Sequence, residues 1–158
     1  PRINDEAASA IGRVFAPAAV HRYDWGEANR IILQVSHKAL LLAFPQHGPG
    51  RKHERPILLE EWQRELTHAH PRALIRGLIH SDGCRTVNRF KTKLPSGRVA
   101  EYAYPRYFFT NVSPDIRDIF CEHCELLGVR WTQSNSRNIS ISHKKSVAIL
   151  EEVVGPKR

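Results

Sequence analysis

Residues 73–83 read Ala-Leu-Ile-Arg-Gly-Leu-Ile-His-Ser-Asp-Gly, and the interpretation of the whole chain starts from them. Their aliphatic residues recur at helical spacing, which predicts a helix with one apolar face. A glycine inside a helix costs about 1 kcal/mol relative to alanine, so Gly77 indicates that another backbone approaches the helix there. The helix ends by presenting one carboxylate, Asp82, immediately before a glycine.

The segments after this helix alternate in a regular order. Strands are predicted over 84–93 and 99–112 about a Pro-Ser-Gly turn, a helix over 113–127 with Ser113 as its N-cap, strands over 130–134 and 138–142, and a helix over 146–154. Before residue 72 the pattern predicts a helix over 2–15, a strand over 30–36, a short helix over 38–44, a polar connector over 46–53 and a helix over 60–67. The fold class is therefore α+β.

The segment from Ile75 to Gly83, together with the element order of residues 72–158, resembles one half of a LAGLIDADG homing endonuclease. The resemblance implies an αββαββα half in which helices cover an antiparallel four-stranded saddle-shaped sheet. It also implies that two signature helices pair, here through Leu74, Gly77, Leu78 and Ser81. The chain departs from the family pattern at Arg76 and His80, neither of which is the metal-binding position.

The same resemblance divides the chain. Residues 57–158 are expected to form one half with its signature helix, and residues 1–56 the tail of a preceding half plus a linker. The absence of methionine and the opening on Pro1 indicate a fragment or a processed piece. The second half is expected either from a missing N-terminal half of the same protein or from a second copy in a homodimer.

The charge of the chain is concentrated after the signature. The net charge is +8, and residues 72–158 carry 15 basic and 8 acidic side chains, against 9 and 8 in residues 1–71. A basic surface of this kind favours binding to a polyanion, here double-stranded DNA. A two-stranded ribbon fits the major groove, where Arg and Lys bind guanine and Asn and Gln bind adenine. The predicted DNA-binding residues are Arg85, Thr86, Asn88, Arg89, Lys91, Lys93, Arg98, Arg106, Arg130, Thr132, Gln133, Asn135, Arg137, Asn138 and Ser140.

The family register places Thr86 and Asn88 outward and Arg85, Val87 and Arg89 inward. A buried, unpaired arginine is unfavourable, so either Arg85 reaches the rim through its aliphatic stem or the register is shifted. An alternative interpretation, in which these charges only solvate an exposed sheet face, remains open.

The resemblance assigns chemistry to a few residues. Asp82 would bind Mg²⁺ or another divalent cation, Asn111 would orient the attacking water, and Lys144 would lie near the scissile phosphate, with Lys145 and Arg106 as further candidates. The implied activity is hydrolysis of phosphodiester bonds in double-stranded DNA by metal-bound water. The rival is a sequence-specific DNA-binding regulator on the same fold that does not cleave, and a third reading is a half-domain that binds RNA. For Asp82 the simpler alternative is an acid in an ordinary Asp-Gly turn.

Three cysteines, nine histidines and no signal sequence or long apolar run predict a reduced intracellular setting, cytoplasmic and nucleoid-associated, with no membrane segment. Cys121 and Cys124 have the short spacing of a zinc-binding pair. No second Cys or His pair lies at zinc-finger spacing, so core and surface positions are the preferred interpretation.

Overall fold

The computed structural model describes residues 3–25 and 30–155. It is a mixed α+β structure whose described residues divide into two compact units, the first ending at His47 and the second beginning at Gly48. The predicted start of the first helix, Arg2, lies outside the described residues. No helix in the described part of the chain is both long and apolar enough to span a bilayer.

The first unit contains α1 (Ile3–Val14), β1 (His21–Trp25), β2 (Arg30–Gln34) and α2 (Leu40–Ala43). Its two strands pair antiparallel, and Phe15 is buried against the rings of His37 and Phe44. The sequence predicts the helix, the second strand and the short helix but misses β1. That strand has no apolar run of its own, and it forms by pairing with the Ile- and Leu-rich β2.

The connector that begins at Gly48 belongs to the second unit. The sequence predicts a boundary after residue 56, whereas the compact units divide between His47 and Gly48. Arg55 donates to the carbonyl oxygens of Gly48, Pro49 and Gly50, and the backbone N–H of Ile57 donates to Asp115 at 2.6 Å. These bonds hold the connector, including the 3-10 turn η2 (Lys52–Glu54), to residues that follow it.

The second unit continues with α3 (Glu61–Ala69), α4 (Pro71–Asp82), β3 (Gly83–Lys93), β4 (Val99–Thr110), α5 (Pro114–Leu126), β5 (Thr132–Gln133), β6 (Asn138–Ile141) and α6 (Lys144–Val154). Its four strands form one antiparallel sheet in the order β3-β4-β6-β5. The predicted element order from residue 72 onward is confirmed, as is Ser113 as the N-cap of α5. Pro71 is the first residue of α4, where its missing N–H costs no helical hydrogen bond.

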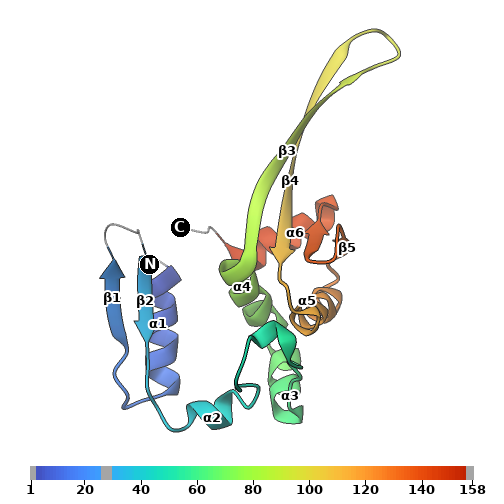
Figure 1. The fold of residues 1–158 in the computed structure, drawn as a ribbon. Helices are drawn as coiled ribbons and strands as arrows, with labels where there is room; N and C mark the ends of the chain where they lie inside the picture. The colour runs from blue at the N-terminus through green and yellow to red at the C-terminus, as the bar shows by residue number, and fades with distance from the viewer. Residues whose placement is uncertain (1–2, 26–29, 156–158) are drawn as a thin grey trace. The chain divides into compact units, whose positions relative to one another are not determined.

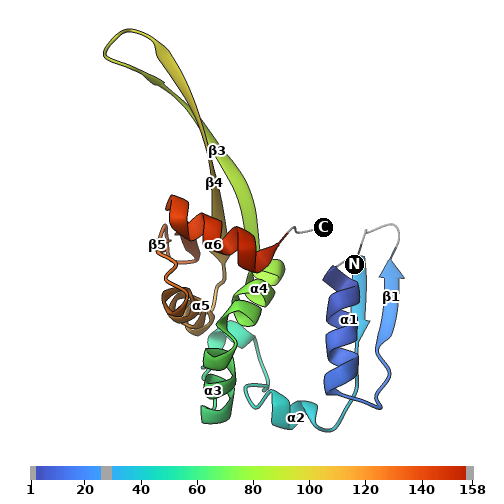
Figure 2. The same cartoon turned by 180° about the vertical axis from the view of Figure 1, so that it is seen from behind.

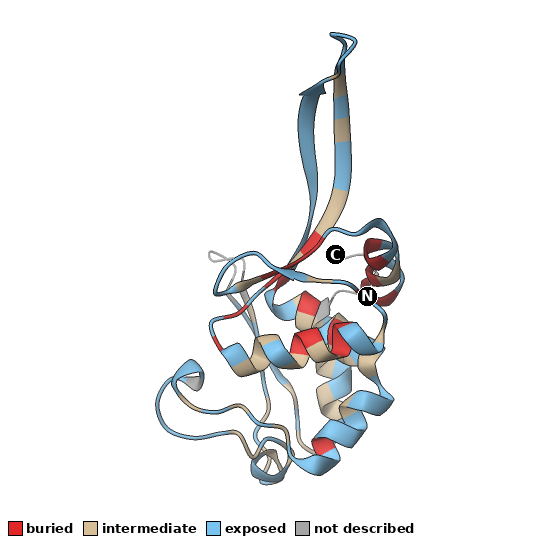
Figure 3. Cartoon of the chain, turned by 90° about the vertical axis from the view of Figure 1, so that its right-hand side faces the viewer, coloured by how far each residue is buried: buried red, intermediate tan, exposed pale blue. Residues whose placement is uncertain are grey.

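Helix α4 forms the centre of this unit, because α3, α5, α6 and the sheet all contact it. Ile75 and Ile79 are completely buried, and Phe109 stacks on Phe120 with ring centroids 4.2 Å apart. The buried residues gather where the helices meet the base of the sheet, while most of the β3/β4 hairpin is exposed (Figure 3). The hairpin therefore projects beyond the helices as a two-stranded ribbon (Figures 1 and 2).

The strand register defines two faces of this ribbon, because directly paired residues share a face. We call one the helix-side face, since its Tyr107 and Phe109 belong to the core. The pairing adds to it Arg85, Val87, Arg89, Lys91, Lys93 and Glu101. The opposite, outer face carries Cys84, Thr86, Asn88, Phe90, Tyr102, Tyr104, Arg106 and Phe108.

Candidate nucleic-acid interface and acid site

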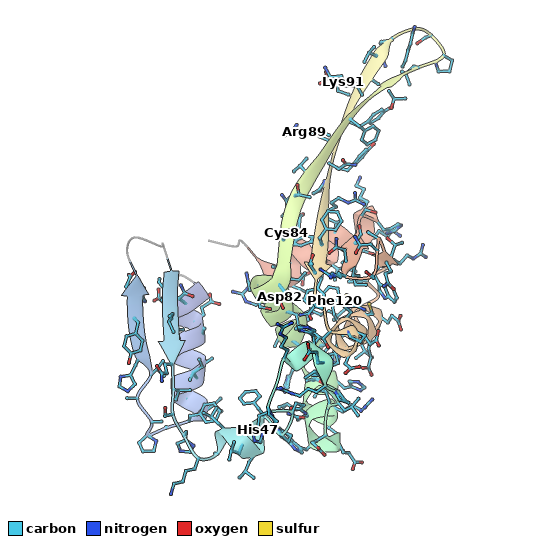
Figure 4. The ribbon with its side chains drawn as sticks, viewed as in Figure 1. His47, Asp82, Cys84, Arg89, Lys91 and Phe120 are labelled. Carbon is cyan, nitrogen blue, oxygen red and sulfur yellow. The ribbon has the colours of Figure 1, made fainter. Side chains whose placement is uncertain are left out.

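Asp82 is the last residue of α4, and the chain passes from it directly into β3. Its carboxylate is exposed, and Oδ2 accepts a hydrogen bond of 2.8 Å from Nδ2 of Asn111. Asn111 follows the end of β4 and is 8% exposed. The predicted pair of acid and amide is thus in direct contact at the base of the hairpin, where Figure 4 labels Asp82.

Asn111 is held in place from the side away from Asp82. Its Oδ1 accepts from the backbone N–H of Ser113 at 2.9 Å, and its own backbone N–H donates to Arg137. The guanidinium of Arg117 donates to its carbonyl oxygen at 2.8 Å. With both ends of its side-chain amide bonded, Asn111 holds one oxygen of the exposed Asp82 carboxylate.

A hollow of about 220 Å³ lies beside this carboxylate. It is lined by His53, Asp82, Thr110, Asn111 and Val112. The sequence places His53 in a polar connector and assigns it no site, because no local pattern links it to a residue 29 positions later. Arg55 shapes the connector that carries this histidine by binding the Gly48–Gly50 carbonyls, and the bond from Ile57 to Asp115 ties the connector to α5.

Lys144 is not brought to Asp82. It begins α6, whereas the other end of that helix contacts α4, where Arg76 and His80 reach the carbonyl oxygen of Val154. The helix rises about 15 Å from Lys144 to Val154. Lys145 is exposed on the same first turn. Arg106 lies on the outer face, opposite Thr86, where it donates to Ser140 at 3.0 Å and stacks over Phe108 at 4.9 Å.

The predicted DNA-binding residues of the hairpin are divided between its two faces. Thr86, Asn88 and Arg106 share the outer face with aromatic side chains, whereas most of the basic residues lie on the helix-side face. Beyond the helices those basic residues are exposed, and Figure 4 shows Arg89 and Lys91 along the projecting ribbon. The predicted set treats these basic and polar residues as one DNA-binding surface. The register instead gives a polar and aromatic face backed by a basic one.

Arg85 lies on the helix-side face, and it has a partner there. Its Nη2 and Nε donate to Oε1 of Glu151 on α6, at 2.6 and 3.1 Å, with both side chains nearly half exposed. The guanidinium therefore points toward the helices, as the family register places it, and is neither buried nor unpaired. The hydrogen bond to Glu151 raises the pKa of Arg85, and desolvation raises that of its neighbour Tyr107.

The hairpin of β5 and β6 offers fewer side chains for contact with DNA than its composition predicts. Asn135 accepts from the backbone N–H groups of Arg137 and Asn138, so it shapes the turn between β5 and β6. Ser140 is 2% exposed and accepts from Arg106, so it positions that arginine. The exposed members of the predicted set here and at the first hairpin's turn are Arg98, Arg130, Thr132, Gln133, Asn135 and Arg137, and Asn138 is half-buried.

The predicted pairing face of α4 is partly open. Leu74 and Leu78 are half-buried, and Leu78 packs against the core. Gly77 and Ser81 are exposed, and within the second unit no atom lies within 4 Å of a Cβ built on Gly77. The close backbone approach that Gly77 indicates is thus not made inside this unit.

Asn111→Ala is expected to lower the free energy of unfolding by about 1–3 kcal/mol, because it leaves the buried N–H of Ser113 without its acceptor. Asp82→Ala is the matched control, since it removes an exposed carboxylate and should cost less. Urea unfolding of both variants measures the difference. Equal losses would show that Asn111 has no structural role beyond its bond to Asp82.

The two cysteines of α5 are core residues. Burial raises the pKa of Cys121 to about 12 and raises that of Cys124 as well, whereas Cys84 is exposed. Buried thiols of this kind are protonated at neutral pH, which disfavours the zinc interpretation. In the described residues no three His, Cys, Asp or Glu side chains form a group that could hold a metal ion.

These thiols predict a labelling pattern. At pH 8 a disulfide reagent should react rapidly with Cys84 alone, and with all three thiols after unfolding.

The raised pKa values also predict that the folded protein loses stability as pH rises from about 9, where an unfolded thiol ionises, toward about 12. Rapid labelling of all three thiols in the folded protein would contradict the burial of Cys121 and Cys124.

No family model and no curated protein sequence matches this chain.

Proposed function

We propose that the chain is a LAGLIDADG-type DNA endonuclease or a fragment of one, which hydrolyses phosphodiester bonds in double-stranded DNA. The observation that carries the proposal is Asp82. It is an exposed carboxylate at the C-terminus of the central helix, fixed by Asn111 at the base of a projecting basic ribbon. The αββαββα order from α4 to α6 supports the same family.

The first unit adds a second line of support. Its order of helix, strand, strand and helix matches the last four elements of such a half, which the sequence alone shows only in part. We therefore extend the proposal to residues 3–44 as the tail of a neighbouring half.

Magnesium fits the chemistry of Asp82, because a hard cation prefers carboxylate oxygen and binds one or two carboxylates together with water and substrate phosphate. When bound, the ion would supply a water of lowered pKa and stabilise charge on the phosphate. Asp82 provides one ligand, and Asn111 provides none while its Oδ1 accepts from Ser113. The remaining protein ligand is proposed to come from a second half.

The open part of the α4 face gives that second half a place to pack. If a second copy of this chain supplies it, Gly77→Leu should weaken self-association, because a large side chain would stand where nothing in the second unit now lies. Sedimentation velocity over a concentration series measures the change, with Gly77→Ala as the milder control. Association unaffected by Gly77→Leu would refute pairing through this face.

A non-cleaving DNA-binding regulator is the second candidate. The single carboxylate and the lack of a three-ligand group in the described residues favour it. One experiment separates the two: duplexes are selected by binding from a pool with a randomised central segment, then incubated with the protein and Mg²⁺ or Mn²⁺. Cleavage of the selected duplexes supports the endonuclease. Salt-sensitive, selective binding without cleavage in either metal supports the regulator.

A further inference from the structure

Three of the aromatic rings on the outer face of the hairpin contact one another, and the predicted DNA-binding set omits them. Phe90 lies directly opposite Tyr102 in the register, and Tyr104 lies two residues farther along β4 on the same face. Their ring centroids are 5.4 Å apart for Phe90 and Tyr102, 5.9 Å for Tyr102 and Tyr104, and 6.0 Å for Phe90 and Tyr104. We call these three residues the aromatic cluster.

Two of the three rings are exposed, and Tyr102 is half-buried between the strands' side chains. Phe90 is 43% exposed and Tyr104 is 51% exposed, far from the core at the base of the sheet. Aromatic rings left on a ribbon beyond the core indicate a binding surface. One hollow on the outer face adjoins them, with a volume of about 260 Å³ and a lining of Asn88, Tyr104, Pro105, Arg106 and Ser142.

The three rings pack together as one apolar group. Their centroids lie 5.4 to 6.0 Å apart, and their planes are inclined by 28° between Phe90 and Tyr102, 13° between Tyr102 and Tyr104 and 36° between Phe90 and Tyr104. Apolar side chains in the major groove match the C5-methyl group of thymine, whereas single-strand binders stack aromatic rings on unpaired bases. The proposed binding of duplex DNA favours the contact with thymine.

We propose that the aromatic cluster reads thymine methyl groups in the major groove and so determines sequence specificity at the outer part of each half-site. The inference rests on the proposed binding of duplex DNA. Asn88 and Arg106, beside the cluster on the same face, supply the hydrogen-bonding contacts of the adjoining base pairs.

The position of the thymines follows from the strand. Phe90 is eight residues after Asp82 and Asn88, the partner of Tyr104, is six. At about 3.3 Å per residue these positions lie roughly 20–26 Å along β3 from the acid. With about 3.4 Å between successive base pairs, the thymines are expected roughly six to eight base pairs from the phosphate beside Asp82.

The experiment selects duplexes from the randomised pool with the full chain and then replaces the enriched thymines by uracil, which removes only the methyl groups. Each lost methyl should weaken binding about fourfold. Phe90→Ala and Tyr104→Ala should bind the thymine and uracil duplexes equally. Val87→Ala, an apolar truncation on the helix-side face of the same strand, should retain the discrimination.

The outcomes separate the two proposals. The role of the cluster is overturned if the protein binds a selected duplex equally tightly with thymine and with uracil. It is also overturned if Phe90→Ala still binds the thymine duplex more tightly than the uracil duplex. Either result leaves the proposed function standing. Failure to enrich any duplex overturns both. Tighter binding to a single-stranded pool, lost in Phe90→Ala, overturns both as well and identifies the cluster as a single-strand platform.

Discussion

Asp82→Asn is expected to abolish metal-dependent cleavage of a selected duplex, with a loss of at least about 10³-fold in rate. A metal ion contributes several kcal/mol to the stabilisation of a phosphoryl transition state, and each 1.36 kcal/mol is tenfold in rate. An amide of the same shape removes the anionic ligand. The fold should persist, because the carboxylate is exposed and the introduced amide oxygen can still accept from Asn111.

Binding must be measured separately from cleavage in this variant. Without metal, removing a negative charge beside the phosphates should leave DNA affinity unchanged or slightly higher. Asp118→Asn makes the same chemical change at an exposed position on α5 and should alter neither quantity. Nicking at the wild-type rate by Asp82→Asn would remove Asp82 from the mechanism.

Gly83→Ala is expected to have the largest effect on folding of any single-methyl change at the junction of α4 and β3. A Cβ at this position would lie 2.7 Å from Cα and 2.8 Å from the carbonyl oxygen of Ile79. The φ of −103° is open to any residue, so the penalty is purely steric. Overpacking against backbone places the loss of unfolding free energy at the upper end of the usual range of about 1–3 kcal/mol.

Gly77→Ala is the matched control for this substitution. It lies in the same helix, and no atom of the second unit would meet its Cβ, so it should stabilise the helix by about 1 kcal/mol. Urea midpoints followed by circular dichroism should therefore move in opposite directions for the two variants. Equal midpoints for Gly83→Ala and the wild type would show that β3 can shift away from α4 without cost.

Gly77 and Gly83 show which features of a glycine the sequence pattern can predict and which it cannot. A helix ending in Asp-Gly is visible in the sequence, and both the helix and the glycine at its end are observed. Only the structure shows that Gly83 is required by contact with Ile79 while Gly77 has open space. Neither fact follows from residue type, because the space around a backbone depends on the segments that pack against it.

The sequence by itself determined the helices and strands of the second unit from residue 72 onward, the N-cap at Ser113 and the α+β class, since periodicity and capping act within a few residues. The antiparallel pairing of the strands was expected only from the family resemblance, and the structure has it. It missed β1, whose residues form a strand only in a pair with β2. Tertiary structure alone decided the contacts of the site. Asn111 reaches Asp82 across 29 positions, Arg85 reaches Glu151 across 66, and the register of β3 and β4 separates the aromatic cluster from most of the basic side chains. Such contacts depend on how the helices pack under the sheet and on strand parity, which a one-residue slip would reverse.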